Sequence, residues 1–155
     1  MELFLVHEPE VKTPFSDVLL RKIFEKTIAK IALFQGTSKN IHLGVAAVSE
    51  ERIQELNREY RGKDSVTDIL SFGEEVSILE SGALPLEEDV VLGDLIYNPE
   101  YIVAAAEEDG VSLEHEMAFI FSHGILHLLG YDHGEEMFRL QDEVASELDE
   151  ENFLQ

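Results

Sequence analysis

The sequence predicts a single α+β domain over residues 1–155, with a mixed sheet of about four strands packed against about five helices. Short apolar or β-branched segments alternate with longer segments whose apolar residues recur every three or four positions. Serine or asparagine precedes several of the longer segments and glycine follows them, which is typical of helix ends. A length of 155 residues with 45% hydrophobic residues suits one core.

The predicted elements follow one another in the order β-α-β-α-β-β-α-α-α. In the first part of the chain we expect a strand over 2–6, a helix from Ser16 that stops at Gly36, a buried strand over 41–48, a helix from Ser49 to Arg61 and a turn over 62–64. In the second part we expect a strand over 66–72, an exposed acidic loop over 73–88, a strand over 90–97, helices over 98–110 and 112–129, and a last helix over 134–148 with a fraying acidic tail.

The formal net charge of −22 is carried by one part of the chain. Residues 1–63 hold ten bases and nine acids, whereas residues 64–155 hold 24 acids and a single base, Arg139. So acidic a chain argues against sequence-blind binding to nucleic acids or anionic membranes. If a nucleic acid does bind, its groove is expected in the near-neutral part, with candidates Arg52, Arg58, Arg61 and Lys63. The alternative is that the acidic part is only a solvated surface.

The absence of cysteine excludes disulfide scaffolds, thiolate zinc sites and cysteine nucleophiles. It also fits a reducing compartment. The N-terminal residues Met1–Phe4 lack the basic and apolar regions of a signal peptide. No apolar run approaches the roughly 18 residues of a membrane span. We therefore expect a cytoplasmic protein without a membrane partner.

Three of the six histidines lie in the segment HGILHLLGYDH, residues 123–133. His123 and His127 are four residues apart on a predicted helix, so their rings leave the same face about one turn apart. Gly130 provides the positive φ at which the helix can end and the chain can bring back His133. Three imidazoles with an open fourth position are typical of catalytic zinc. The predicted metal site therefore lies on a helix and the turn that follows it.

Simpler explanations of these histidines have to be weighed. A lone histidine on an apolar helix is usually a core residue, but three at this spacing favour a metal site. The spacing is also that of metzincin proteases, in which a glutamate follows the first histidine as general base. Here that position is Gly124, which cannot take a proton. A peptidase would have to recruit another carboxylate.

Three segments carry a resemblance to a known family. They are the histidine segment 123–133, the block Leu56–Phe72 with the motif YRGKD, and Leu92-Gly93-Asp94. Together, and in this order from about residue 45 to 145, they resemble the YbeY family of bacterial rRNA maturation factors, which are zinc-dependent single-strand endoribonucleases. The resemblance implies one Zn²⁺ per chain and RNA as substrate, a ribosomal RNA precursor in particular. It also implies the ribosome or ribosomal proteins as partners, and no DNA.

The resemblance also implies residue roles. His123, His127 and His133 are expected to ligate zinc, and Arg61 is expected to be catalytic. A guanidinium beside the metal suits a scissile phosphodiester, because its planar fork binds phosphate and stabilises developing charge. Asp132 is expected to accept a hydrogen bond from an imidazole N–H, or to accept a proton. The simpler interpretation is that Asp132 is only a turn residue. The expected substrate-binding residues are Arg58, Lys63, Thr67, Asp68 and Ser71.

Two interpretations compete with a zinc-dependent ribonuclease of rRNA maturation and ribosome quality control. One is a metzincin-like metal-dependent peptidase. The other is a non-catalytic ribosome assembly factor with a structural metal, for which a fourth protein ligand on the metal would be diagnostic. Asp94 is expected either to support a metal ligand or to be an acid of a loop.

Overall fold

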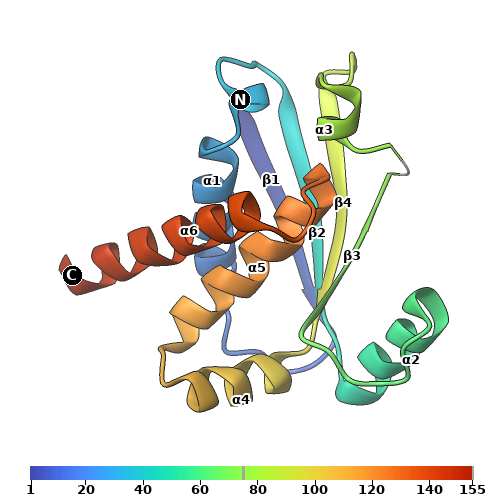
Figure 1. The fold of residues 1–155 in the computed structure, drawn as a ribbon, viewed down its shortest axis with the longest axis vertical. Coiled ribbons are helices and arrows are strands. Elements are labelled where there is room, and N and C mark those ends of the chain that lie inside the picture. The colour runs from blue at the N-terminus through green and yellow to red at the C-terminus, as the bar shows by residue number, and fades with distance from the viewer. Residues whose placement is uncertain (75, 155) are drawn as a thin grey trace.

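The computed structural model describes residues 1–74 and 76–154 (Figure 1). These residues form a four-stranded mixed sheet and six α-helices, which confirms the predicted α+β class with one helix more than expected. The strands are β1 (Glu2–Pro9), β2 (Asn40–Ala47), β3 (Ile69–Gly73) and β4 (Asp89–Tyr97). The helices are α1 (Asp17–Ala29), α2 (Glu50–Arg61), α3 (Ile78–Ser81), α4 (Pro99–Asp109), α5 (Leu113–Leu129) and α6 (Glu135–Leu154).

The strand order in the sheet is β1-β2-β4-β3. Strands β1, β2 and β4 are parallel to one another, and β3 runs antiparallel to β4 with Ile69 opposite Tyr97 and Gly73 opposite Gly93. The register between β2 and β4 shifts at His42/Leu43, where β4 contains one extra residue, Leu92. Strand β3 is therefore an edge strand, and its second edge is free of strand pairing.

Helices α1, α5 and α6 form a layer on one face of the sheet (Figure 1). The central helix of this layer is α5, which contacts α1, α4, α6, β3 and β4. Alternate residues of β2 point into this layer, as expected for a strand with one face in the main core. These residues are Ile41, Leu43, Val45 and Ala47.

Helix α2 packs on the opposite face of the sheet, near β3. Its buried residues Ile53 and Leu56 contact Val48 and Leu70 in a second, smaller cluster. Ser49 caps the helix by accepting the Arg52 N–H at 3.2 Å. The smaller cluster thus anchors α2 beside the edge strand, and the C-terminal end of α2 lies next to β3.

Several predicted boundaries differ from the structure, for identifiable reasons. Strand β1 continues past residue 6 to Pro9, because its parallel pairing with β2 extends to Pro9 opposite Ala47. Strand β3 begins at Ile69 and not at Val66, because its partner β4 ends at Tyr97, opposite Ile69, and the chain enters α4 at Pro99. Helix α1 ends at Ala29, well before Gly36, and a 3-10 turn, η1 (Ala32–Phe34), follows it.

The remaining two differences concern the acidic second part of the chain. The predicted loop 73–88 contains the short helix α3, capped by Ser77. Helix α6 continues to Leu154 instead of fraying after Leu148. Lys26 and Lys30 of α1 pair with carboxylates of α6, and these ion pairs favour the longer helix. The paired carboxylates are Glu143, Glu147 and Glu151. No helix in the described residues is long and apolar enough to cross a bilayer.

Candidate metal centre

The helix that carries two of the three histidines is fixed at both ends by local hydrogen bonds. Ser112 accepts the His115 N–H at 3.0 Å and caps the N-terminus of α5. Gly130, with a φ of 107°, ends the helix in the left-handed region and donates its N–H to the carbonyls of Leu126 and His127. Regular helix between these caps places His123 and His127 one turn apart on the same face.

The turn after α5 brings the third histidine back to the other two. One nitrogen from each of the three rings lies within 4.8 Å of the others. The Nε2 atoms of His127 and His133 are 2.9 Å apart, and the ring centroids of His123 and His133 are 5.0 Å apart. The rings of His123 and His127 are partly buried, and His133 is exposed. The three residues can therefore hold a metal ion from one side.

The donor set fits a borderline metal such as zinc. Three imidazole nitrogens are the ligands of open, catalytic zinc sites, in which the fourth position is left for water or substrate. Three neutral imidazoles also suit other divalent transition metals, so the geometry indicates three residues that can hold a metal ion and does not identify the ion.

Electrostatics favour metal binding by keeping the rings of His123 and His127 neutral. Burial lowers the pKa of His123 below its ordinary value. Burial, and then the neighbouring rings of His123 and His133, lower the pKa of His127. A neutral imidazole offers a lone pair to a metal ion, so both shifts reduce competition from protons near neutral pH.

Gly124 allows α5 to lie directly on the sheet. A Cβ at this position would lie 2.8 Å from Leu95 Cδ2 and 3.1 Å from Ile69 Cδ1. Any side chain here would therefore force the helix, or the side chains of Leu95 and Ile69, to move. This is the position at which metzincins carry their glutamate. The close packing therefore argues, in addition to the missing carboxylate, against peptidase chemistry at this site.

A cleft of about 620 Å³ opens beside the histidines. Its walls come from the C-terminal end of α2, from the segment 65–71 and from α5. Five of the residues predicted to act on the substrate or in catalysis line this cleft together with the three histidines. They are Arg61, Lys63, Thr67, Asp68 and Ser71.

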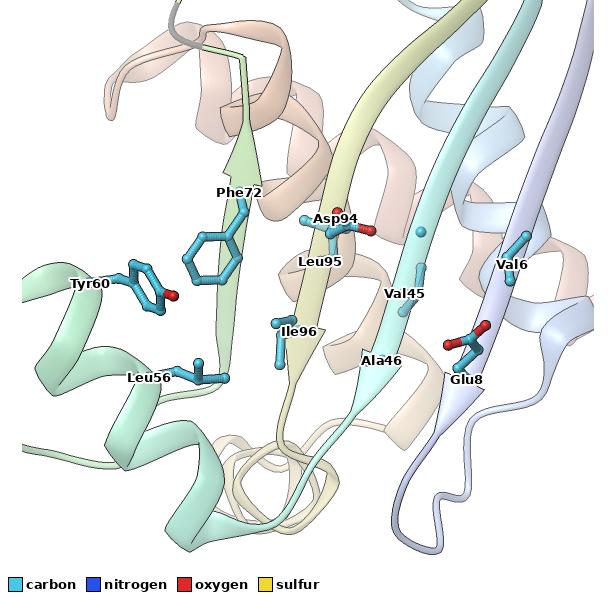
Figure 2. Close-up of a pocket in the computed structure, with 11 residues that line it drawn as sticks. Val6, Glu8, Val45, Ala46, Leu56, Tyr60, Phe72, Asp94, Leu95 and Ile96 are labelled. Carbon is cyan, nitrogen blue, oxygen red and sulfur yellow. The ribbon is translucent and has the colours of Figure 1, made fainter.

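Arg61 is held at the cleft by two contacts with β3. Its Nη2 donates a hydrogen bond to the Ser71 carbonyl at 2.5 Å, on the free edge of the strand. Its Cζ lies over the Phe72 ring, 5.1 Å from the centroid, in a cation–π contact. Figure 2 shows Phe72 and Tyr60 facing each other between β3 and α2, and their ring centroids are 5.3 Å apart. Phe72 thus supports Arg61, a role that the sequence alone did not indicate.

Three charged residues that were predicted to take part in substrate binding or catalysis do not line the cleft. Arg58 pairs with Asp64 at the surface, 3.4 Å from Nη1 to Oδ1, and Arg52 pairs with Glu55. Asp132 is exposed and makes no hydrogen bond to an imidazole among the described residues, although its charge raises the pKa of His127 slightly against the larger lowering effects.

Asp94 belongs to another part of the molecule. It lies on β4 and lines a separate pocket of about 490 Å³ on the open face of the sheet, with Val6, Glu8 and Ile96 around it (Figure 2). A Cβ on Gly44 would lie 2.2 Å from its Oδ1, so the carboxylate rests on the glycine of the neighbouring strand. Both expectations for Asp94 are wrong: it is neither beside the histidines nor in a loop.

One residue in contact with the histidines was missed by sequence reasoning. Gln141 of α6 is fully buried, and its side chain lies 3.3 Å from His123 Nδ1. A signal for it exists in the sequence, because Gln141 is the single polar member of the buried stripe of α6. The other members are Met137, Leu140, Val144, Ala145 and Leu148.

Comparison with known proteins assigns the chain to a family. The profile described as "Endoribonuclease YbeY" matches residues 7–149. The chain belongs to the YbeY family. Endoribonuclease YbeY of Ureaplasma urealyticum serovar 10 is 39% identical over 146 residues, which cover 90% of this chain and 88% of that protein. Endoribonuclease YbeY of Halalkalibacterium halodurans is 35% identical and covers 94% of both chains.

A solved structure supports the fold of this YbeY family member. A solution structure of a Thermotoga maritima protein matches it with a TM-score of 0.61 and 29% identity, over 95% of this chain and 90% of that one. The resemblance noted from the motifs is therefore confirmed, and so is the α+β class. The roles of individual residues in the cleft stay predictions.

Proposed function

We propose that this YbeY family member is a zinc-dependent endoribonuclease that cuts single-stranded RNA in rRNA maturation and ribosome quality control. The observation that carries the proposal is the cleft in which three imidazoles and Arg61 lie together. Membership of a family of endoribonucleases makes the chain a hydrolase of RNA. The cleft supports the proposal with two features that such chemistry needs, three imidazoles able to hold a metal ion and a cation for the phosphate.

Each part of the cleft has a chemical task. A bound metal ion would activate water and polarise the scissile phosphate. Arg61 would bind the phosphodiester and stabilise the charge that develops on its oxygens, with Ser71 and Phe72 fixing the guanidinium beforehand. Lys63 would contact a neighbouring phosphate, and Thr67 and Asp68 would contact the sugar or base. Asp132, exposed beside the ligand turn, is proposed to accept a proton.

Charge restricts how RNA reaches the cleft. The cationic wall is the end of α2, with Arg61 and Lys63, whereas α4, α5 and α6 carry 14 of the 24 acids of residues 64–155. Carboxylates repel phosphates over about 8 Å at physiological salt. We therefore place the RNA strand along α2 and the free edge of β3, and we expect its binding to be weak and sensitive to salt.

The biological setting is part of the proposal. We infer a ribosomal RNA precursor as the substrate, presented by the ribosome or ribosomal proteins. A partner is expected because a chain of net charge −22 has a low affinity for free RNA. We therefore propose that the protein acts in the cytoplasm. We also propose that residues 1–155 act as one metal-dependent hydrolase domain without DNA as a substrate.

The test compares three preparations on one fluorescently labelled single-stranded RNA: zinc-loaded wild type, chelator-treated wild type, and His127→Ala. The proposal predicts cleavage by the first alone, restored in the second by added zinc, and much slower cleavage of the same sequence in a duplex. Equal activity in all three preparations would contradict it. Chelator-sensitive cleavage of a peptide library would favour the peptidase, and a fourth protein ligand on the metal would favour a structural metal.

A further inference from the structure

We propose that Gln141 is a positioning residue that holds the His123 ring with its proton on Nδ1 and its lone pair on Nε2, oriented for the metal ion. This inference rests on the metal site of the proposed function. It concerns a residue of α6, 18 positions after His123 in the chain, whose side chain reaches α5 from the neighbouring helix.

The orientation of the Gln141 amide follows from its second contact. The side-chain nitrogen lies 3.1 Å from the carbonyl oxygen of Phe119, on α5 one turn before His123. A carbonyl oxygen can only accept, so the amide NH₂ must be the group that faces it. The amide oxygen then faces His123 Nδ1 at 3.3 Å.

The orientation of the amide in turn fixes the imidazole tautomer. An amide oxygen has no hydrogen to give, so the contact is a hydrogen bond only if His123 Nδ1 carries the proton. An imidazole that ligates a metal ion is neutral, so the ring has one proton in total. The lone pair is then on Nε2, the nitrogen left to join the group that His127 and His133 form.

The burial of Gln141 indicates what its amide is for. The side chain is 0% exposed and lies within the apolar stripe of α6. A buried amide costs free energy unless it is hydrogen bonded, and a methionine or leucine would fill such a position at lower cost. Both of its hydrogen bonds go to α5, to the His123 ring and to the backbone one turn earlier. Packing alone does not require this amide, whereas orienting His123 does.

The experiment uses the full chain and two substitutions of Gln141. Gln141→Met keeps the length of the side chain and removes the acceptor, and Gln141→Glu keeps the acceptor. Leu148→Ala, two turns further along α6 in the same buried stripe, is the control for loss of stability without loss of the contact. All four proteins are checked for folding by circular dichroism and thermal unfolding before use.

Two measurements are made on each protein. Nitrogen-15 NMR of the metal-free protein reports which ring nitrogen of His123 is protonated, and competition with a chromophoric chelator reports zinc affinity. We expect the Nδ1–H tautomer in wild type and in Gln141→Glu. In Gln141→Met we expect a mixture of tautomers and a zinc affinity lower by about 10- to 100-fold. Zinc affinity in Leu148→Ala should stay at the wild-type value despite its lower unfolding temperature.

An Nε2–H tautomer in wild type would overturn the inference, and so would an unchanged zinc affinity in folded Gln141→Met. Loss of affinity in Leu148→Ala equal to that in Gln141→Met would also overturn it, because the effect would then follow stability. Absence of zinc binding by wild type would instead overturn the proposed function. The tautomer is read without metal, so the two failures can be told apart.

Discussion

Gly130 and Ser77 are in direct contact, and a Cβ atom on Gly130 would lie 2.1 Å from Oγ of Ser77. Ser77 caps α3, and Gly130 ends α5 with a φ of 107°. The contact holds the segment that follows β3 against the turn that carries His133. Position 130 therefore needs glycine for two reasons. The backbone there is in the left-handed region, and Ser77 occupies the space that a Cβ atom would fill.

Replacing Gly130 by alanine should destabilise the protein by about 3 kcal/mol, since left-handed strain and displacement of Ser77 add together. Gly110→Ala is the matched control. Gly110 also ends a helix, with a φ of 69°, but a Cβ there would have no atom within 4 Å. Its substitution should cost about 1 kcal/mol. Urea unfolding measures both, and equal losses would show that the Ser77 contact does not matter.

Arg61→Lys should lower kcat/KM for RNA cleavage by about 100-fold while leaving zinc content unchanged. Lysine keeps the charge, but it lacks the planar fork that binds phosphate and stacks on Phe72. Arg21→Lys is the control, because Arg21 pairs with Glu25 on the surface of α1. The two variants are compared in the same RNA cleavage assay. Similar cleavage rates for the two variants would show that Arg61 takes no part in the reaction.

Tyr97→Phe should lower the free energy of unfolding by about 2 kcal/mol. The Tyr97 hydroxyl is 2.9 Å from both His7 Nε2 and Thr13 Oγ1, and His7 Nδ1 in turn donates to Asp17 at 2.7 Å. Removing the hydroxyl leaves Nε2 of the buried His7 ring without a hydrogen-bond donor. Tyr101→Phe, at a residue that is 43% exposed, should change the free energy of unfolding little.

The same tyrosine predicts a response to alkali. Burial raises the pKa of Tyr97 to about 12. The folded protein therefore keeps the phenol proton over a pH range in which the unfolded chain, with a pKa near 10, has lost it. Stability from this group is full below pH 10 and is lost as the pH rises toward 12. Wild type should lose stability over that range more steeply than Tyr97→Phe, as denaturant unfolding at several pH values would show.

The metal-free protein should lose stability in mild acid. Burial lowers the pKa values of His123 and His127 in the folded state, so below the ordinary value of about 6.5 the unfolded chain binds more protons. Acidification therefore favours unfolding as the pH falls through and below 6.5. Unfolding of wild type and His127→Gln at pH 7.5 and 5.5 tests this. The variant should show the smaller loss, and an equal loss would contradict the assignment.

Elements with local signals were predictable from the sequence. Helices α4 and α5 begin and end where Asn98, Gly110, Ser112 and Gly130 predicted, because caps are satisfied by neighbouring residues. The start of β3 and the end of α6 were not predictable. The first depends on pairing with β4, whose last residue Tyr97 lies opposite Ile69, and the second on ion pairs with α1. Such contacts join residues far apart in the sequence.

The candidate site divides in the same way. The three histidines could be predicted, because helical spacing and one glycine determine their convergence. The contacts of Phe72 with Arg61 and of Gln141 with His123 could not, because they need the packing of α2 on β3 and of α6 on α5. Arg58 resembled Arg61 in charge and position, but the fold pairs it with Asp64 instead.

The most direct test is a zinc titration of the metal-free protein, with cleavage of single-stranded RNA followed at each addition. We predict that the cleavage rate is near zero without metal, rises linearly and reaches a plateau at one zinc ion per chain. His133→Ala should show no rise over the same range. Full cleavage by the metal-free protein, or a rise that is the same in His133→Ala, would contradict a catalytic metal held by His123, His127 and His133.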